Sequence, residues 1–277
     1  MSQKRIKQGI KDFLSAVAPK AASNWQEVRR RRHILQFEQR MGLPALTVEF
    51  IAEHGQTVLE GPFTGMKYIT QAAGSALMPK LLGCYEAELH DVIALVIATD
   101  YDAVIDIGCA EGYYANGLAM RLPSTQIYAF DTDLRAQTLC KEMAQLNGVG
   151  KQVTVFGECQ HHNLIELMTG RLLIVCDCEG YEIILLQPTR VPALVQADIL
   201  VELHDQERPG LTSLLLARFQ ATHSVTLITS VERDAVIYSS LKFSEPEKRR
   251  LAVSEFRSPG QQWAFLKANT PASKLTV

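Results

Sequence analysis

The chain has 277 residues, of which 47% are hydrophobic and 21% are charged, and its formal net charge is −2. This length allows one large α/β domain with an added arm, or two small domains. The charge balance predicts no nucleic-acid partner. We expect no membrane span and no secretory signal, because no apolar run approaches the ~20 residues that a span needs. The six cysteines stand in apparent core segments, which is typical of reduced thiols in a cytoplasmic protein.

The N-terminal part of the chain is predicted to form helices and a β-hairpin. Apolar residues at helical spacing predict one helix over residues 6–17 and a second over residues 25–41. Residues 46–60 have the pattern of a hairpin, with two apolar runs around a polar turn. We expect residues 1–85 to cover one side of the ligand site in the following domain, rather than to fold independently.

From residue 86 onward, predicted helices and strands alternate. Helices are expected at 86–98, 112–122, 134–147 and 211–221. The expected strands are residues 103–107, 126–130, 153–156, 172–176, 198–203, 224–229 and 262–267. This alternation predicts a mainly parallel, doubly wound α/β sheet with helices on both faces. We therefore expect residues 86–277 to form one domain, with its ligand at the carboxyl ends of the strands.

A glycine loop with Gly108 and Gly112 follows the first of these strands. Glycines let a backbone approach a ligand closely, and their N–H groups can bind a carboxylate. Ala110 breaks the G-x-G-x-x-G pattern of a dinucleotide site, which disfavours a nicotinamide-dependent oxidoreductase. Asp106, on the strand itself, is placed to meet an ammonium group. As the alternative, the two glycines could be plain turn residues.

Acidic residues follow the next two strands. Asp131 could accept hydrogen bonds from both ribose hydroxyls of a nucleoside, and Glu158 could accept one from an adenine amino group. Asp131 could instead cap the helix that begins at Leu134. Together with the glycine loop, these acids predict an adenosine with an amino-acid tail and no phosphate, which is S-adenosylmethionine.

Several segments resemble known methyltransferase motifs. Residues 104–115, Val-Ile-Asp-Ile-Gly-Cys-Ala-Glu-Gly-Tyr-Tyr-Ala, resemble the first motif of class I S-adenosylmethionine methyltransferases. Residues 176–182, Cys-Asp-Cys-Glu-Gly-Tyr-Glu, resemble the I-D-V-E-G-x-E motif of the FkbM-type methyltransferase family. Residues 82–86, 128–131 and 200–204 also fit that family.

This resemblance covers roughly residues 82–205. It implies a Rossmann-like class I methyltransferase sheet, and methyl transfer to an oxygen, or with lower preference a nitrogen, of a small molecule, sugar or natural product. Residues 1–85 would then cover the acceptor side. The alternative is a non-catalytic partner protein that binds the donor. The expected donor-binding residues are Glu86, Asp106, Gly108, Cys109, Ala110, Gly112, Tyr113, Asp131, Thr132, Glu158, Cys159 and Asp177.

Titratable residues near the ends of the fourth and fifth strands are the candidates for activating the acceptor: Asp177, Glu179, Glu202 and His204. Residues two apart on a strand share a face, so these groups can gather, and one could serve as general base. Alternatively, His204 could be structural, Asp177 and Glu202 could be buried acids held by loop amides, and Glu182 could be an exposed helix residue. We expect no metal. If one is bound, the similar arrangement in catechol-type O-methyltransferases implies that Asp177 holds it together with His204 or, as the alternative, Asp205.

Overall fold

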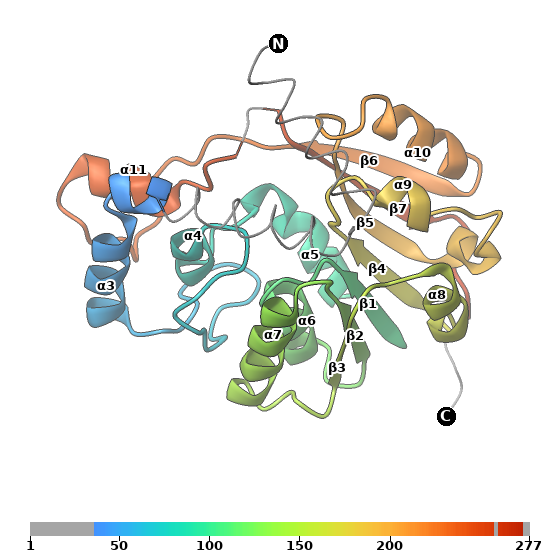
Figure 1. Cartoon of the computed structure of the whole chain (residues 1–277), viewed down its shortest axis with the longest axis horizontal. Coiled ribbons are helices and arrows are strands. Elements are labelled where there is room, and N and C mark those ends of the chain that lie inside the picture. The colour runs from blue at the N-terminus through green and yellow to red at the C-terminus, as the bar shows by residue number, and fades with distance from the viewer. Residues whose placement is uncertain (1–35, 258–259, 274–277) are drawn as a thin grey trace, which may run out of the picture. The chain divides into compact units, whose positions relative to one another are not determined.

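The computed structural model describes residues 36–257 and 260–273 of the chain (Figure 1). The chain divides into two compact units, Met1–Glu53 and His54–Val277. The first predicted helix and most of the second lie outside the described residues. Within the described parts of the chain, no helix has the length and apolarity needed to cross a membrane.

Helix α3, Leu43–His54, lies where the sequence predicts a hairpin over residues 46–60, so that prediction is wrong. The segment alternates apolar and polar residues, but Val48 is 69% exposed, so the alternation is not the pattern that is buried. Pro44 lies in the first turn of α3, where its missing N–H would have no helical partner. The buried residues recur instead at the helical spacing of three and four: Leu43, Leu46 and Phe50.

Seven strands form one sheet in the order β3-β2-β1-β4-β5-β7-β6. All seven match the predicted strands to within one residue. Strands β1 to β5 run parallel, and β7 pairs antiparallel with both β5 and β6. Strand order reverses between β1 and β4, which makes the sheet doubly wound. The strands are β1 Ala103–Ile107, β2 Gln126–Phe130, β3 Val153–Phe156, β4 Leu172–Cys176, β5 Asp198–Leu203, β6 His223–Thr229 and β7 Gln262–Ala268.

Helices cover both faces of this sheet. Figure 1 shows α6 and α7 on one side, and α8, α9 and α10 on the other. The four helices predicted between residues 86 and 221 are confirmed, as η1 Ala87–Leu89 with α5 His90–Ile97, α6 Tyr113–Arg121, α7 Leu134–Leu146 and α10 Leu211–Phe219. The sequence patterns did not indicate the shorter elements α4 Leu77–Leu82, α8 His161–Leu167, α9 Glu182–Leu185, η2 Pro192–Gln196 and α11 Pro246–Val253.

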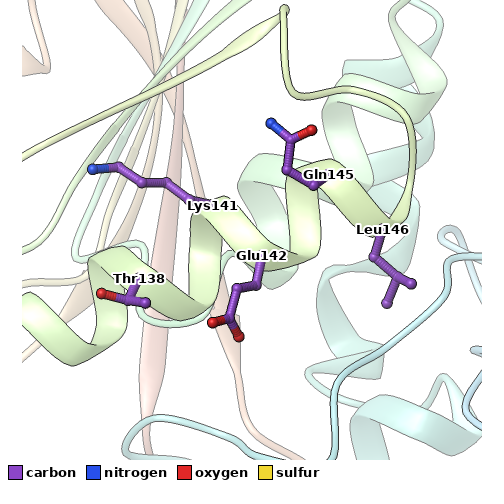
Figure 2. A pocket seen from close by; sticks show the side chains of 5 residues that line it. All are labelled: Thr138, Lys141, Glu142, Gln145 and Leu146. Carbon is purple, nitrogen blue, oxygen red and sulfur yellow. The ribbon is translucent and has the colours of Figure 1, made fainter.

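An open hollow lies along the outer surface of α7 (Figure 2). Its lining comes from this one helix, and the five side chains are exposed: Thr138, Lys141, Glu142, Gln145 and Leu146. None of them is a predicted site residue. Since α7 begins at the carboxyl edge of the sheet and runs away from it, the hollow does not coincide with the expected ligand site.

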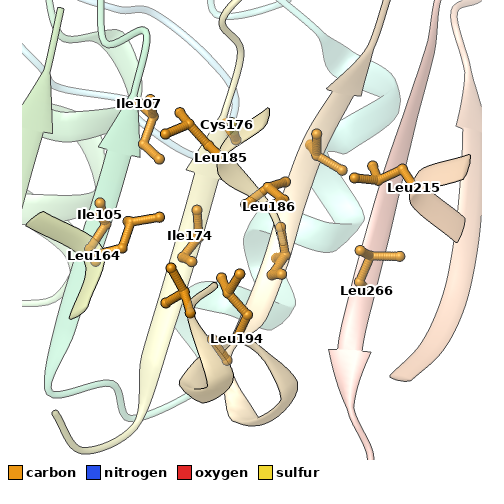
Figure 3. Packing of buried hydrophobic residues seen from close by; sticks show 14 of the residues in the cluster. Ile105, Ile107, Leu164, Ile174, Cys176, Leu185, Leu186, Leu194, Leu215 and Leu266 are labelled. Carbon is orange, nitrogen blue, oxygen red and sulfur yellow. The ribbon is translucent and has the colours of Figure 1, made fainter. Parts of the chain in front are cut away.

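Strands β1 and β4 are buried at every position, because helices cover both faces of the sheet there. On one face, side chains of β1, β4 and β7 pack against α8, α9, η2 and α10; Figure 3 labels Ile105, Ile107, Leu164, Ile174, Cys176, Leu185, Leu186, Leu194, Leu215 and Leu266. Side chains alternate along a strand, so Asp106 and Glu202 lie on the opposite face. The sheet therefore places these two acids away from the largest apolar cluster.

Candidate active site

The glycine loop after β1 packs directly against the backbone after β4. Gly108 has a φ of +84°, and a Cβ there would lie 1.6 Å from the carbonyl oxygen of Asp177. A Cβ on Gly112 would similarly lie 2.3 Å from the side-chain amide nitrogen of Asn116. Both glycines are thus required by contacts within the protein, whether or not a ligand is bound. The role of the loop in holding a ligand stays a prediction.

Asp131 ties this loop to the segment after β2. Its carboxylate accepts hydrogen bonds from the backbone N–H of Ala110, at 2.9 Å, and of Asp133, at 2.8 Å. Ala110 has a φ of +49°, which is uncommon for a residue with a side chain. The N-cap of α7 is Asp133, which accepts from the N–H of Arg135. Asp131 is therefore not the helix cap that the sequence left as an alternative.

Asp106 is a buried acid, 3% exposed, at the end of β1. Its Oδ2 atom is buried and has no hydrogen-bond partner among the described residues. The pKa of Asp106 is raised to about 7, because burial and the nearby carboxylates of Asp177, Asp131 and Glu86 outweigh a lowering by the N–H of Ala115. An uncompensated carboxylate oxygen in this position favours a ligand that brings positive charge or hydrogen-bond donors.

Glu111, inside the glycine loop, has a role that the sequence did not reveal. The residue is fully buried and forms an ion pair with Lys80 at 2.5 Å. It also accepts hydrogen bonds from the Tyr68 hydroxyl, at 2.5 Å, and from the N–H of Ala73, at 2.8 Å. Burial raises the pKa of Glu111, but Lys80, the Tyr68 hydroxyl and the N–H of Ala73 together outweigh this effect, and the net pKa is lowered. Glu111 thus fastens residues 68–80 to the loop.

Tyr113 and Tyr114 begin α6 and pack among other aromatic rings. The Tyr113 ring is buried, with its centroid 5.2 Å from those of both Phe63 and Tyr85. The Tyr114 hydroxyl donates a hydrogen bond to Glu86. Packing therefore accounts for the position of Tyr113 without a ligand. Contact between Tyr113 and the donor stays a prediction.

The residues predicted on the adenine side differ in exposure. Glu158 and Thr132 are exposed at the edge of the sheet, whereas Cys109 and Cys159 are each 4% exposed. Glu158 follows β3 and Thr132 follows β2, which places both after the carboxyl ends of neighbouring parallel strands. They are free to approach a ligand lying across those ends.

Arg257 gathers three acids beside the end of β5, although no motif marks it in the sequence. Its guanidinium pairs with Glu202 at 2.7 Å, with Glu255 at 2.9 Å and with Glu86. Burial raises the pKa of Glu86 to about 7, against a lowering by Arg257. The pKa of Glu202 is raised to about 10, because burial and the nearby Asp177 outweigh a lowering by Arg257. Arg257 thus binds two buried carboxyl groups together at this edge.

Asp177, Glu182 and His204 form a second cluster at the ends of β4 and β5. His204 Nδ1 lies 2.9 Å from Glu182 Oε1, and His204 Nε2 lies 3.5 Å from Asp177 Oδ1. Glu182 is fully buried, so the alternative of an exposed helix residue is wrong. The Asp177 side chain is 46% exposed and is the member that faces solvent. Glu179, with a φ of +55°, lies exposed in the turn between them.

The charge of His204 follows from its two acidic neighbours. Burial lowers the pKa of His204, but Glu182 and Asp177 outweigh this and raise it above the ordinary value. The two acids therefore favour the protonated form of the imidazole. One atom from each of the three residues lies within 4.8 Å of the others, and carboxylate oxygens with an imidazole nitrogen suit a divalent cation. Asp205 instead accepts from the N–H groups of Gly210 and Thr212 at the start of α10.

No protein-family model and no curated protein sequence matches the chain. Solved structures with a similar fold include a proposed O-methyltransferase from Klebsiella pneumoniae, with a TM-score of 0.46 and 15% identity over 68% of this chain and 82% of that one. The O-methyltransferase TomG from Streptomyces achromogenes has a TM-score of 0.42 and 13% identity, over 67% and 81% of the two chains. An rRNA methylase from Streptococcus thermophilus has a TM-score of 0.42 and 12% identity, over 65% and 96%.

The sheet itself defines the class of fold. Five parallel strands, in an order that reverses between β1 and β4, are followed by β7 inserted antiparallel between β5 and β6. This is the arrangement of the class I methyltransferase fold, with helices on both faces. The fold class predicted from the sequence is therefore confirmed.

Proposed function

We propose that the protein is an S-adenosylmethionine-dependent methyltransferase acting on an oxygen, or as second choice a nitrogen, of a small molecule, sugar or natural product. The observation that carries this proposal is the unpartnered, buried carboxylate oxygen of Asp106 at the carboxyl edge, beside Asp131 and Asp177. Burying an uncompensated carboxylate is costly unless a ligand supplies positive charge or donors. The donor brings both, on its ammonium and its sulfonium.

In this proposal the donor lies across the ends of β1, β2 and β3. Asp131 would hold its ribose. The N–H groups of Gly108, Cys109, Ala110 and Gly112 already donate to protein oxygens, so the carboxylate of the donor would be held by the remaining N–H groups of the loop. The Asp131 carboxylate already accepts two backbone hydrogen bonds, yet its two oxygens have further lone pairs for the hydroxyls. Glu158 would meet the adenine amino group. The other proposed contacts are Glu86, Gly108, Cys109, Ala110, Gly112, Tyr113, Thr132, Cys159 and Asp177.

The surrounding charges favour this donor over a dinucleotide. A pyrophosphate needs positive charge or a bed of free N–H groups. Three cations of the described residues are paired with acids: Lys80 with Glu111, Arg233 with Glu88 and Glu255, and Arg257 with three acids. These three are not available to a phosphate. Because Ala110 also breaks the glycine pattern of a dinucleotide site, a nicotinamide-dependent oxidoreductase is the weaker candidate.

Acceptor activation is assigned to the cluster around Asp177. In methyl transfer, an acceptor lone pair forms the new C–O or C–N bond while the C–S pair leaves with sulfur, and the acceptor loses a proton. Asp177 is the most exposed acid in the cluster, so we propose that it takes this proton. Glu202 and His204 would position it. His204 itself could accept the proton only at a pH above its raised pKa.

A divalent cation is a second route to acceptor activation. Held by Asp177, Glu182 and His204, it would lower the pKa of a bound acceptor hydroxyl. We do not favour this route, because both imidazole nitrogens of His204 already lie close to carboxylate oxygens, one of Glu182 and one of Asp177. We also propose that the chain belongs to the FkbM-type family, because residues 176–182 resemble its motif. Glu182 is the last acid of that segment.

Release of S-adenosylhomocysteine in the presence of candidate acceptors tests the proposed activity. Donor binding without product release from any sugar, hydroxylated or amine acceptor would favour the alternative of a non-catalytic donor-binding partner. We further propose a cytoplasmic protein whose partner is a small molecule, not a nucleic acid or a membrane. An RNA acceptor would contradict that part of the proposal, since phosphate backbones require a basic surface.

A further inference from the structure

Two cysteines flank Asp177 at the end of β4. The Sγ atoms of Cys176 and Cys178 lie 3.6 Å apart. A disulfide bond is about 2.05 Å long, so the sulfur atoms would have to approach by about 1.5 Å. Rotation of the two side chains with a small shift of the intervening backbone would bring them together.

The two thiols differ in access to solvent. All six cysteines lie in the described residues, and Cys178 is the one that is not buried. Cys176 is 1% exposed and faces the apolar cluster beneath the sheet. A dissolved oxidant would therefore reach Cys178 first, and Cys176 would be the thiol that attacks next from inside.

We propose that Cys176 and Cys178 form a reversible disulfide that distorts the methyl-transfer site. A small disulfide such as oxidised glutathione is the oxidant. The Cys178 thiolate attacks one of its sulfurs and expels one glutathione thiolate, giving a mixed disulfide. The Cys176 thiolate then attacks Cys178 Sγ and expels the second glutathione. The two cysteines lose two protons and two electrons in total, and the oxidant takes them up and is reduced to two thiols.

The location of this pair connects it to both halves of the site. The carbonyl oxygen of Asp177, between the two cysteines, is the atom that packs against Gly108 of the glycine loop. The N–H of Cys178 donates to Glu182 Oε1 at 2.9 Å, and Glu182 in turn contacts His204. We expect ring closure through residues 176–178 to shift this backbone as well as to rotate the two side chains, because the two sulfurs are not yet within bonding distance. The Asp177 carboxylate and the loop would both move.

Mass spectrometry of the whole protein, incubated with oxidised glutathione, tests the disulfide. We expect wild type to lose two hydrogens and keep no glutathione, and peptide mapping to join Cys176 to Cys178. Cys176→Ser should instead trap one glutathione on Cys178, because the resolving thiol is gone. Cys178→Ser should stay unmodified, and the matched control Cys84→Ser, at another buried cysteine, should behave as wild type. A wild-type protein that is unmodified, keeps glutathione or joins other cysteines would overturn the proposal.

The effect on methyl transfer rests on the proposed function, whereas the mass measurement does not. Oxidised wild type should lose at least about tenfold in affinity for S-adenosylmethionine, equal to 1.4 kcal/mol, and recover it with dithiothreitol. Cys178→Ser should keep its affinity under the same oxidation. A mapped disulfide that leaves wild-type affinity and turnover unchanged would overturn the distortion. A reduced protein that binds no donor would contradict the proposed function, while the mass result would still decide whether the disulfide forms.

Discussion

Lys80 and Glu111 form an ion pair at 2.5 Å in which both side chains are buried, 3% and 0% exposed. The pair joins α4 to the glycine loop, two elements that lie 31 residues apart in the sequence. Removing one partner would leave the other charge buried without compensation. Such a loss costs far more than an exposed ion pair contributes.

Lys80→Met should therefore destabilise the protein by about 3–5 kcal/mol in urea unfolding. The double variant Lys80→Met/Glu111→Leu should lose less than the single variant, because it buries no unpaired charge. A single variant within about 0.5 kcal/mol of wild type would show that the pair does not hold this segment in place.

Donor affinity should depend on pH through Asp106 and Glu86. Burial raises the pKa of each carboxyl to about 7. Both are largely protonated below that pH and carry negative charge above it, so a cationic donor should bind more tightly as pH rises. We expect a gain of about tenfold between pH 6 and pH 8 for each group that must ionise. Calorimetry in buffers of different ionisation enthalpy should detect proton release on binding at pH 7. Affinity that falls with pH would contradict this account.

Asp131→Ala should weaken S-adenosylmethionine binding by about 1.5–3 kcal/mol, because a charged hydrogen-bond acceptor for the ribose is lost. Asp133→Ala is the matched control. It removes the N-cap of α7 two residues away and should cost about 1 kcal/mol of stability while leaving donor affinity unchanged. Equal losses of affinity in the two variants would mean that Asp131 only supports the loop.

Turnover should survive EDTA. We expect Asp177→Asn to lower kcat by about 10²–10⁴ with little effect on donor binding, as the loss of a general base would. If chelation instead stops turnover and Mg²⁺ or Mn²⁺ restores it, the cluster of Asp177, Glu182 and His204 holds an ion, and the metal-free assignment is wrong.

The strands could be predicted because most are short apolar runs, and β2, β4 and β5 are each followed directly by a polar residue. Asp177 directly follows β4, and the parallel sheet brings it to the same edge as Asp106 and Asp131. The hairpin failed because residues 46–50 satisfy two periods at once, and only packing decides which residues are buried. The local sequence pattern alone could therefore not show that this segment forms a helix.

Partners across long sequence distances could not be predicted. Arg257 lies 55 residues from Glu202 and 171 from Glu86, in a segment with no motif or periodicity. Glu182 looked like any acid in the first turn of a helix, where exposure is usual. Its burial depends on His204, which another strand supplies. In both cases the signal is a pairing of opposite charges in space, which no single stretch of sequence contains.

The most direct test of the central claim is a calorimetric titration of the reduced protein with S-adenosylmethionine, beside one with NAD. We predict saturable binding of one S-adenosylmethionine per chain and no heat of binding with NAD. Binding of NAD, or no binding of S-adenosylmethionine by the folded protein, would contradict the assignment of this edge as a methyl-donor site.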